Sequence, residues 1–111
     1  MTVTVTVLIP AKIAEAAQTT QYTSTGVTTL IDKFTATNYS AVPATISVNL
    51  VTTAGSAGNL NLITKTKTLQ PAEVYTFPEI VGQALAAGDF ISTIAGTATS
   101  INIRASGRQV T

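Results

Sequence analysis

Apolar and polar residues alternate along residues 2–9, and this two-residue period is typical of a β-strand. One face carries Val3, Val5, Val7 and Ile9, whereas the other carries three threonines and Leu8. An uncharged, alternating segment of this kind is able to pair with the sheet of another chain. Two interpretations are therefore open: a strand inside the sheet of its own domain, or an N-terminal arm used in an assembly.

The same period recurs downstream and predicts about eight short strands. Pro10 is expected to end the first strand, and residues 12–18 to form a helical turn or an ordered loop. Residues 90–95 and 99–105 are expected to form a final hairpin around Gly96. The other strands are predicted over residues 19–24, 27–31, 32–38, 44–53, 60–68 and 74–77. Strands at this spacing predict an all-β fold, namely a two-sheet β-sandwich of jelly-roll or Greek-key connectivity, with a closed small barrel as the alternative.

One stretch departs from the strand period. Residues 76–79 read Thr-Phe-Pro-Glu, which matches a capping box with Thr76 as the cap and Glu79 reaching back to it. Apolar residues then recur at helical spacing at Ile80, Val81, Ala84 and Leu85, before Gly88 and Asp89. The pattern predicts one short helix near residues 77–86 that closes one end of the sandwich.

Composition supports a single domain over residues 1–111 with an unusually uncharged surface. The chain has 22 threonines and only 10% charged residues, which suits strands and leaves hydroxyls and amides outside. Such a surface costs less to desolvate against a partner than a charged one. The net charge is +1 with scattered basic residues, so no nucleic-acid partner is expected. No apolar run is long enough to span a membrane, and no secretory signal follows Met1, so no membrane partner is expected either.

The residues that most enzymes need are missing. The chain has no histidine and no cysteine, which excludes Ser-His and Cys-His nucleophiles and thiolate metal sites. Glu79 and Asp89 flank the predicted helix, where cap and turn roles are expected for them. Tyr22, Tyr39 and Tyr75 are expected to be packing residues. We therefore expect no catalytic residue, no cofactor and no metal site, and a binding or structural role.

Several segments carry a family resemblance, from residue 38 onwards. They are residues 38–51, Leu-Gln-Pro-Ala-Glu at 69–73, Phe-Pro-Glu-Ile-Val-Gly-Gln at 77–83, Leu-Ala-Ala-Gly-Asp-Phe-Ile at 85–91 and Ile-Asn-Ile-Arg-Ala-Ser-Gly at 101–107. In these segments the chain resembles small virion proteins of tailed bacteriophages, in particular the capsid decoration (staple or cement) proteins of short-tailed phages. Their motifs also occur in phage tail and head-tail joining proteins.

The resemblance implies a structural virion protein on the outer capsid surface, made in the host cytoplasm. As a homodimer it would bind the major capsid protein of an HK97-like shell, bridge neighbouring capsomers and stabilise the capsid. The alternatives are a tail or head-tail joining protein, or a carbohydrate-binding, adhesin-like module that would use Tyr39 or Tyr75. The resemblance supplies no contact residue. From the pattern alone we predict contacts at both termini, because terminal strands can extend a partner's sheet: Thr2, Val3, Thr4, Val5, Thr6, Val7, Leu8 and Ile9, and Arg108, Gln109, Val110 and Thr111.

Overall fold

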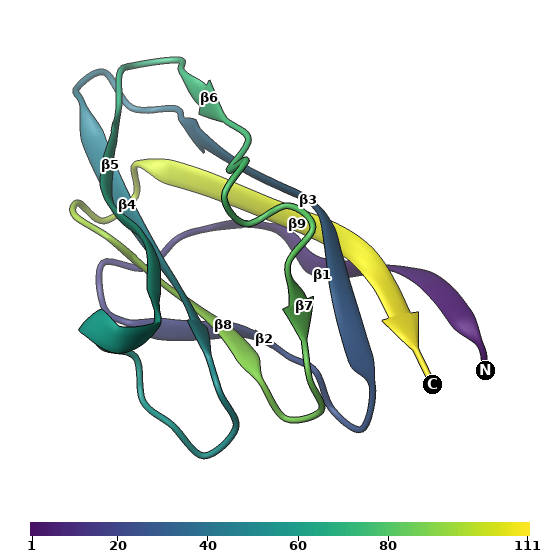
Figure 1. The fold of residues 1–111 in the computed structure, drawn as a ribbon. Helices are drawn as coiled ribbons and strands as arrows, with labels where there is room; N and C mark the ends of the chain where they lie inside the picture. The colour runs from purple at the N-terminus through teal and green to yellow at the C-terminus, as the bar shows by residue number, and fades with distance from the viewer.

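The computed structural model describes residues 1–111 as two antiparallel sheets packed face to face (Figure 1). Sheet A has the strand order β1-β9-β3-β6, with β7 also paired to β3, and sheet B has the order β2-β8-β4-β5. The predicted all-β, two-sheet sandwich is confirmed. The elements are β1 (Val3–Ile13), β2 (Thr19–Thr23), β3 (Thr28–Asn38), β4 (Ala44–Val51), the 3₁₀-helix η1 (Asn59–Asn61), β5 (Leu62–Leu69), β6 (Val74–Tyr75), β7 (Ala84–Leu85), β8 (Phe90–Ala95) and β9 (Ile101–Val110).

The strands pair in nested order, from the middle of the chain outwards. β4 and β5 form the central hairpin, β3 pairs with β6 and β7, β2 pairs with β8, and β1 pairs with β9, all antiparallel. Successive pairs alternate between sheet B and sheet A. One long antiparallel ribbon is thus wrapped into two sheets, which is the strand order of a jelly roll.

Both sheets contribute to one hydrophobic core of 18 buried residues. Alternation along β4 buries Ile46 and Val48, and alternation along β9 buries Ile101 and Ile103. Phe34 of β3, opposite Ala105 of β9 in sheet A, also has no exposed surface. Branched and aromatic side chains fill a two-sheet interface well, because they stand away from the pleated backbone.

The prediction of a short helix near residues 77–86 is wrong, because these residues form a turn and then a strand. Phe77 adopts a left-handed backbone (φ +48°), the amide of Val81 closes a single turn on its carbonyl at 3.0 Å, and Gly82 follows with φ +93°. The amide of Gly82 then donates to Ile31 of β3 at 2.7 Å, and Gln83 accepts a bond from the same residue at 3.0 Å. Hydrogen bonding to the β3 edge therefore replaces further helical turns, and the chain continues as β7.

The prediction that Pro10 ends the first strand is also wrong, because β1 continues to Ile13. Of the two alternatives predicted over residues 12–18, residues 14–18 form the loop and no helical turn is present. The register with β9 shifts between Ile9 and Lys12, so Pro10 lies in an irregular part of an edge strand. Proline is tolerated at such positions, because its missing N–H would have no ladder partner.

The remaining differences concern strand pairing. The two strands predicted over residues 27–31 and 32–38 form one strand, β3. The predicted hairpin of β8 with β9 is wrong, because β8 belongs to sheet B and β9 to sheet A. The predicted return strand after residue 60 is confirmed as β5, paired with β4. The single helical element, η1, has three residues, so the structure holds no helix with the length and apolar character to span a bilayer.

A candidate interface on sheet A

The two predicted contact segments lie side by side. β1 pairs with β9, with Val3 opposite Val110 and Thr6 opposite Gly107. Beyond the strands, the backbones of Thr2 and Thr111 exchange two hydrogen bonds, of 3.1 and 2.9 Å. Residues 1–9 are therefore tied to their own sheet, and Figure 1 shows both termini at the same end of the molecule. Whether these residues contact a partner stays a prediction.

β1 is an edge strand, and its second long side has no strand partner. Backbone N–H and C=O groups on such a side can pair with an added strand. Natural edge strands are usually protected by charged side chains or proline. Residues 2–9 contain neither, since Pro10 and Lys12 come only after them. The N-terminal half of β1 is thus an open position for a further strand in sheet A.

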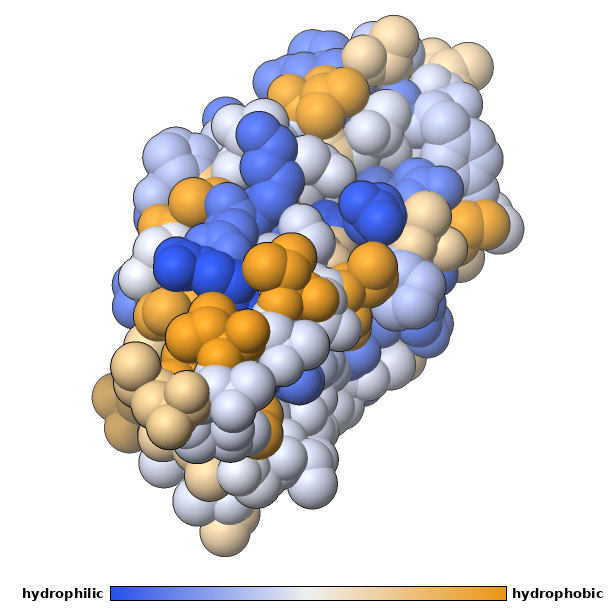
Figure 2. Space-filling view, turned by 90° about the vertical axis from the view of Figure 1, so that its right-hand side faces the viewer, coloured by the Kyte–Doolittle hydropathy of each residue, from blue (hydrophilic) through white to orange (hydrophobic).

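An exposed row of valines lies along this edge. Val3, Val5 and Val7 are 51%, 79% and 46% exposed. They share the outer face of sheet A with half-buried Leu30 and Val110, because cross-strand partners in a sheet point to the same side. Figure 2 shows hydrophobic patches on this side of the molecule, directly beside strongly hydrophilic ones. An apolar row beside a free backbone edge offers a partner both hydrogen bonds and apolar area to bury.

A β-bulge ends the exposed row. The register of β1 shifts by one residue between Val7, which is opposite Ser106, and Ile9, which is opposite Ala105. Leu8 is the extra residue, and it is buried together with Ile9. The bulge therefore separates the exposed row from Leu8 and Ile9, which anchor β1 in the core.

A second bulge lies at the same level in β3, where Ile31 is opposite Gly107 but Lys33 is opposite Ser106. The extra residue, Asp32, is exposed and accepts hydrogen bonds from Arg108 on both carboxylate oxygens. Nε donates to Oδ2 at 3.0 Å and to Oδ1 at 3.3 Å, and Nη2 donates to Oδ1 at 3.0 Å. The hydrogen bonds to this carboxylate raise the pKa of Arg108. The pair is solvated, so it adds little stability, but it neutralises the one carboxylate on this face of β3 and β9.

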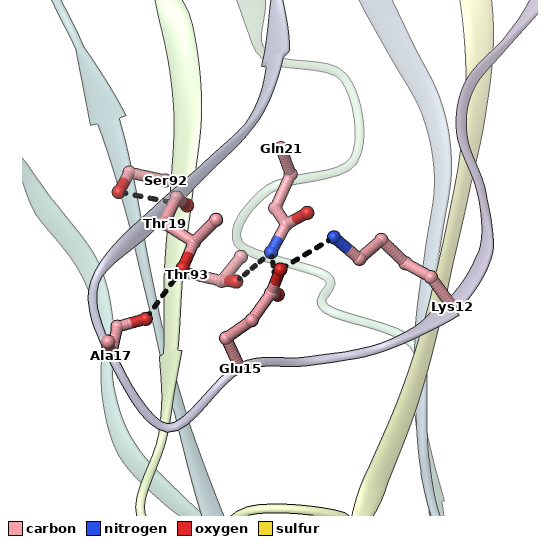
Figure 3. A network of polar contacts seen from close by, with 7 residues as sticks. All are labelled: Lys12, Glu15, Ala17, Thr19, Gln21, Ser92 and Thr93. Atoms are coloured by element: carbon pink, nitrogen blue, oxygen red, sulfur yellow. Dashed lines mark hydrogen bonds and ion pairs between the residues drawn. The ribbon is translucent and has the colours of Figure 1, made fainter.

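A polar network fixes the base of the edge strand to both sheets (Figure 3). Lys12 donates to Glu15 at 2.9 Å, Gln21 donates to Glu15 at 2.9 Å, and Gln21 also donates to Thr93 at 3.0 Å. The hydrogen bond from Lys12, and then that from Gln21, lower the pKa of Glu15. β1, β2 and β8 are thereby held together at one corner, and an edge that is fixed before binding loses less entropy when a partner is added.

The acids near the predicted helix do not form a site. The predicted capping role of Glu79 is wrong, because its carboxylate accepts hydrogen bonds from Thr64 and from the Tyr75 hydroxyl. Asp89 instead accepts from the backbone amides of Ala86 and Thr53, each at 3.0 Å. The two carboxylates thus serve different turns. No group of three or more carboxylates converges to hold a metal ion.

Tyr75 gives a pH prediction from this cluster. Its hydroxyl donates to Glu79 at 2.7 Å, and this bond, followed by burial, raises the pKa of Tyr75 from 10.0 to about 12. Ultraviolet titration should therefore show one of the three tyrosines ionising near pH 12. The folded chain holds this proton more tightly than the unfolded chain does, so the contact stabilises the fold below pH 10 and is lost towards pH 12. Glu79→Gln should lower that midpoint, and a single transition of all three tyrosines in the native chain would contradict the assignment.

Two basic residues on this face, Lys33 and Arg104, were not predicted from the sequence. Lys33 and Arg104 are distant in sequence, and only the pairing of β3 with β9 brings them together. One sequence feature does point to this face: along β9, Arg104 and Arg108 alternate with core residues, so they lie on the outer face of the sheet.

Comparison of the chain with protein-family models, with curated proteins and with solved structures found no match.

Proposed function

We propose that this chain is a non-enzymatic structural protein of a phage virion that binds the outer surface of the capsid. It is made in the host cytoplasm, pairs as a homodimer and bridges neighbouring capsomers of an HK97-like major capsid protein. The single observation that carries the proposal is the uncharged free edge of β1 with its row of exposed valines. The sequence resemblance to capsid decoration proteins supplies the identity of the partner.

The physics of the edge suits this role. An added strand gains main-chain hydrogen bonds along β1, and the valines give the contact its apolar part. One contact of this size is weak, but repetition over a symmetric shell raises the overall avidity by orders of magnitude. With 10% charged residues, the surface costs little to desolvate over a broad contact.

Lysines in the valine row should weaken this binding. We expect the double variant Val3→Lys, Val5→Lys to lose at least about tenfold in affinity for undecorated HK97-like capsids, about 1.4 kcal/mol per site. Lysine on an edge strand disfavours strand addition, and both positions are exposed, so the fold should be kept. Co-sedimentation with capsids measures the affinity, and thermal unfolding checks the fold.

The matched control is Val74→Lys. Val74 is 53% exposed and lies on β6, at the opposite edge of sheet A. The Val74→Lys variant should bind capsids as the native chain does. Native-like binding by the double lysine variant, or an equal loss in the control, would overturn the role of β1. Analytical ultracentrifugation distinguishes this function from that of a head-tail joining protein. A dimer is expected for the capsid decoration protein, whereas a stable closed ring would favour a head-tail joining protein.

A further inference from the structure

A depression on the outer face of sheet A is lined by side chains from β3 and β9. Its lining residues are Lys33, Thr35, Arg104, Ala105 and Ser106. Lys33 is opposite Ser106, and Thr35 is opposite Arg104, so the two basic residues are diagonal neighbours on one face. The bulge at Asp32 sets this register and brings Lys33 to the outside.

The charges in this depression have no partner within the chain. The two ion pairs of the structure are Lys12–Glu15 and Arg108–Asp32, and neither includes Lys33 or Arg104. Asp32 is the nearest acid in sequence, but Arg108 already occupies both of its oxygens. Like charges that lie close together on one face of a sheet repel each other, and an anion between them would relieve that repulsion. The depression therefore offers an ammonium and a guanidinium group to an external anion.

The distribution of charge argues against a polyanion. Apart from Lys33 and Arg104 in the depression and the two ion-paired cations, the basic side chains are Lys65 and Lys67, both on β5 of sheet B. Lys67 lies over the ring of Tyr75, with its Nζ 4.8 Å from the ring centroid. No basic stripe extends the depression along sheet A, as a nucleic-acid backbone would need. The site fits one isolated anionic group.

The surroundings indicate that this anion belongs to a protein. Ser106 is opposite Lys33 on one side and opposite the exposed Val7 on the other. A single row across sheet A therefore joins the valines of the edge to the basic depression. A ligand that covers both needs an apolar part next to an acidic group. A planar carboxylate also matches the two-point geometry of a guanidinium group.

We infer that the depression between β3 and β9 binds a glutamate or aspartate carboxylate from a partner protein segment that crosses the outer face of sheet A. The inference rests on the proposed function and names the chemistry of the partner. The acid does not come from a strand added to β1, because strands lie about 4.8 Å apart and β1 separates the added strand from β9, which lines the depression. It comes from a neighbouring part of the same partner.

The test is an NMR titration of the isotope-labelled full chain at low salt. The probes are the peptide acetyl-Val-Glu-Val-Thr-Val-amide and its counterpart with glutamine in place of glutamate. We expect the glutamate peptide to shift the backbone amides of Lys33, Thr35, Arg104 and Ser106, and the glutamine peptide to leave them in place. The Arg104→Gln variant should lose the response, whereas Lys65→Gln should keep it. Equal shifts with both peptides, or none with the glutamate peptide, would overturn the inference.

Two further probes separate the sources of the anion. Inorganic phosphate and a single-stranded oligonucleotide should shift these four amides less than the glutamate peptide does, and a larger shift with either one would overturn the assignment to a protein carboxylate.

Capsid-binding measurements distinguish a failure of this inference from a failure of the proposed function. Charge reversal by Lys33→Glu with Arg104→Glu should lower capsid affinity about tenfold, and Lys65→Glu should not. If charge reversal has no effect while lysines in the valine row weaken binding, the edge contact stands and the carboxylate site fails.

Discussion

Replacing Phe77 with alanine is expected to reduce the free energy of unfolding by about 3–5 kcal/mol. The side chain has no exposed surface, and its ring packs edge-on against two others. The ring centroids lie 4.6 Å from that of Phe34 and 4.7 Å from that of Tyr75. Truncation leaves a cavity between the turn at residues 77–82 and sheet A. The left-handed backbone at Phe77 strains alanine as it strains phenylalanine, so it does not offset the loss.

Urea unfolding with a matched set of variants measures this effect. Phe77→Leu keeps most of the buried volume and should cost clearly less than the alanine variant. Val81→Ala lies in the same turn but is 39% exposed, and should change stability by no more than about 0.5 kcal/mol. A Phe77→Ala variant as stable as Val81→Ala would mean that the turn does not cover the core.

The strands were predictable where apolar residues alternate with polar ones. Ile46 and Val48 in β4, and Ile101 and Ile103 in β9, follow the alternation and all lie in the core. Sheet burial imposes that period on each strand separately, so it is visible in a local window. The all-β class follows from the same local signal.

The prediction of a helix was wrong because the strand that competes for its hydrogen bonds, β3, is distant in sequence. Residues 77–86 satisfy a local helical pattern, but the edge of β3 offers Ile31 as a hydrogen-bond partner for Gly82 and Gln83. Sheet pairing over that distance has no local signature. The same limit explains the wrong hairpin, since β8 and β9 alternate correctly yet join different sheets.

The candidate interface was predictable only in part. The uncharged alternation of residues 2–9 is visible in the sequence, but its position at a sheet edge depends on the pairing of β1 with β9 alone. The basic depression depends on a bulge that aligns Lys33 with Ser106. Tertiary register creates that site, so the separate signals of Lys33 and Arg104 look like ordinary solvated charges.

Gly107→Ala is expected to cost about 3 kcal/mol or more, because the sheet has no space for a side chain at this position. A Cβ atom on Gly107 would overlap the backbone carbonyl oxygen of Leu30 and lie 3.0 Å from Cδ1 of Leu8. The first neighbour is backbone, so β3 and β9 would have to separate. This happens at the level where both bulges meet, beside Ser106.

Thermal and urea unfolding measure the cost, with Gly58→Ala as the matched control. A Cβ atom at Gly58 meets no atom within 4 Å, and its backbone is extended at φ −169°, so the control should stay within about 0.5 kcal/mol of the native chain. Separation of β3 from β9 would also displace Ser106 from Lys33. The glycine variant should therefore respond less to the glutamate peptide even under conditions where it is folded. A Gly107→Ala variant as stable as the native chain would mean that β3 and β9 do not approach as closely as the structure shows. The pairing of Lys33 with Ser106, which places the two basic residues side by side, would then be in doubt as well.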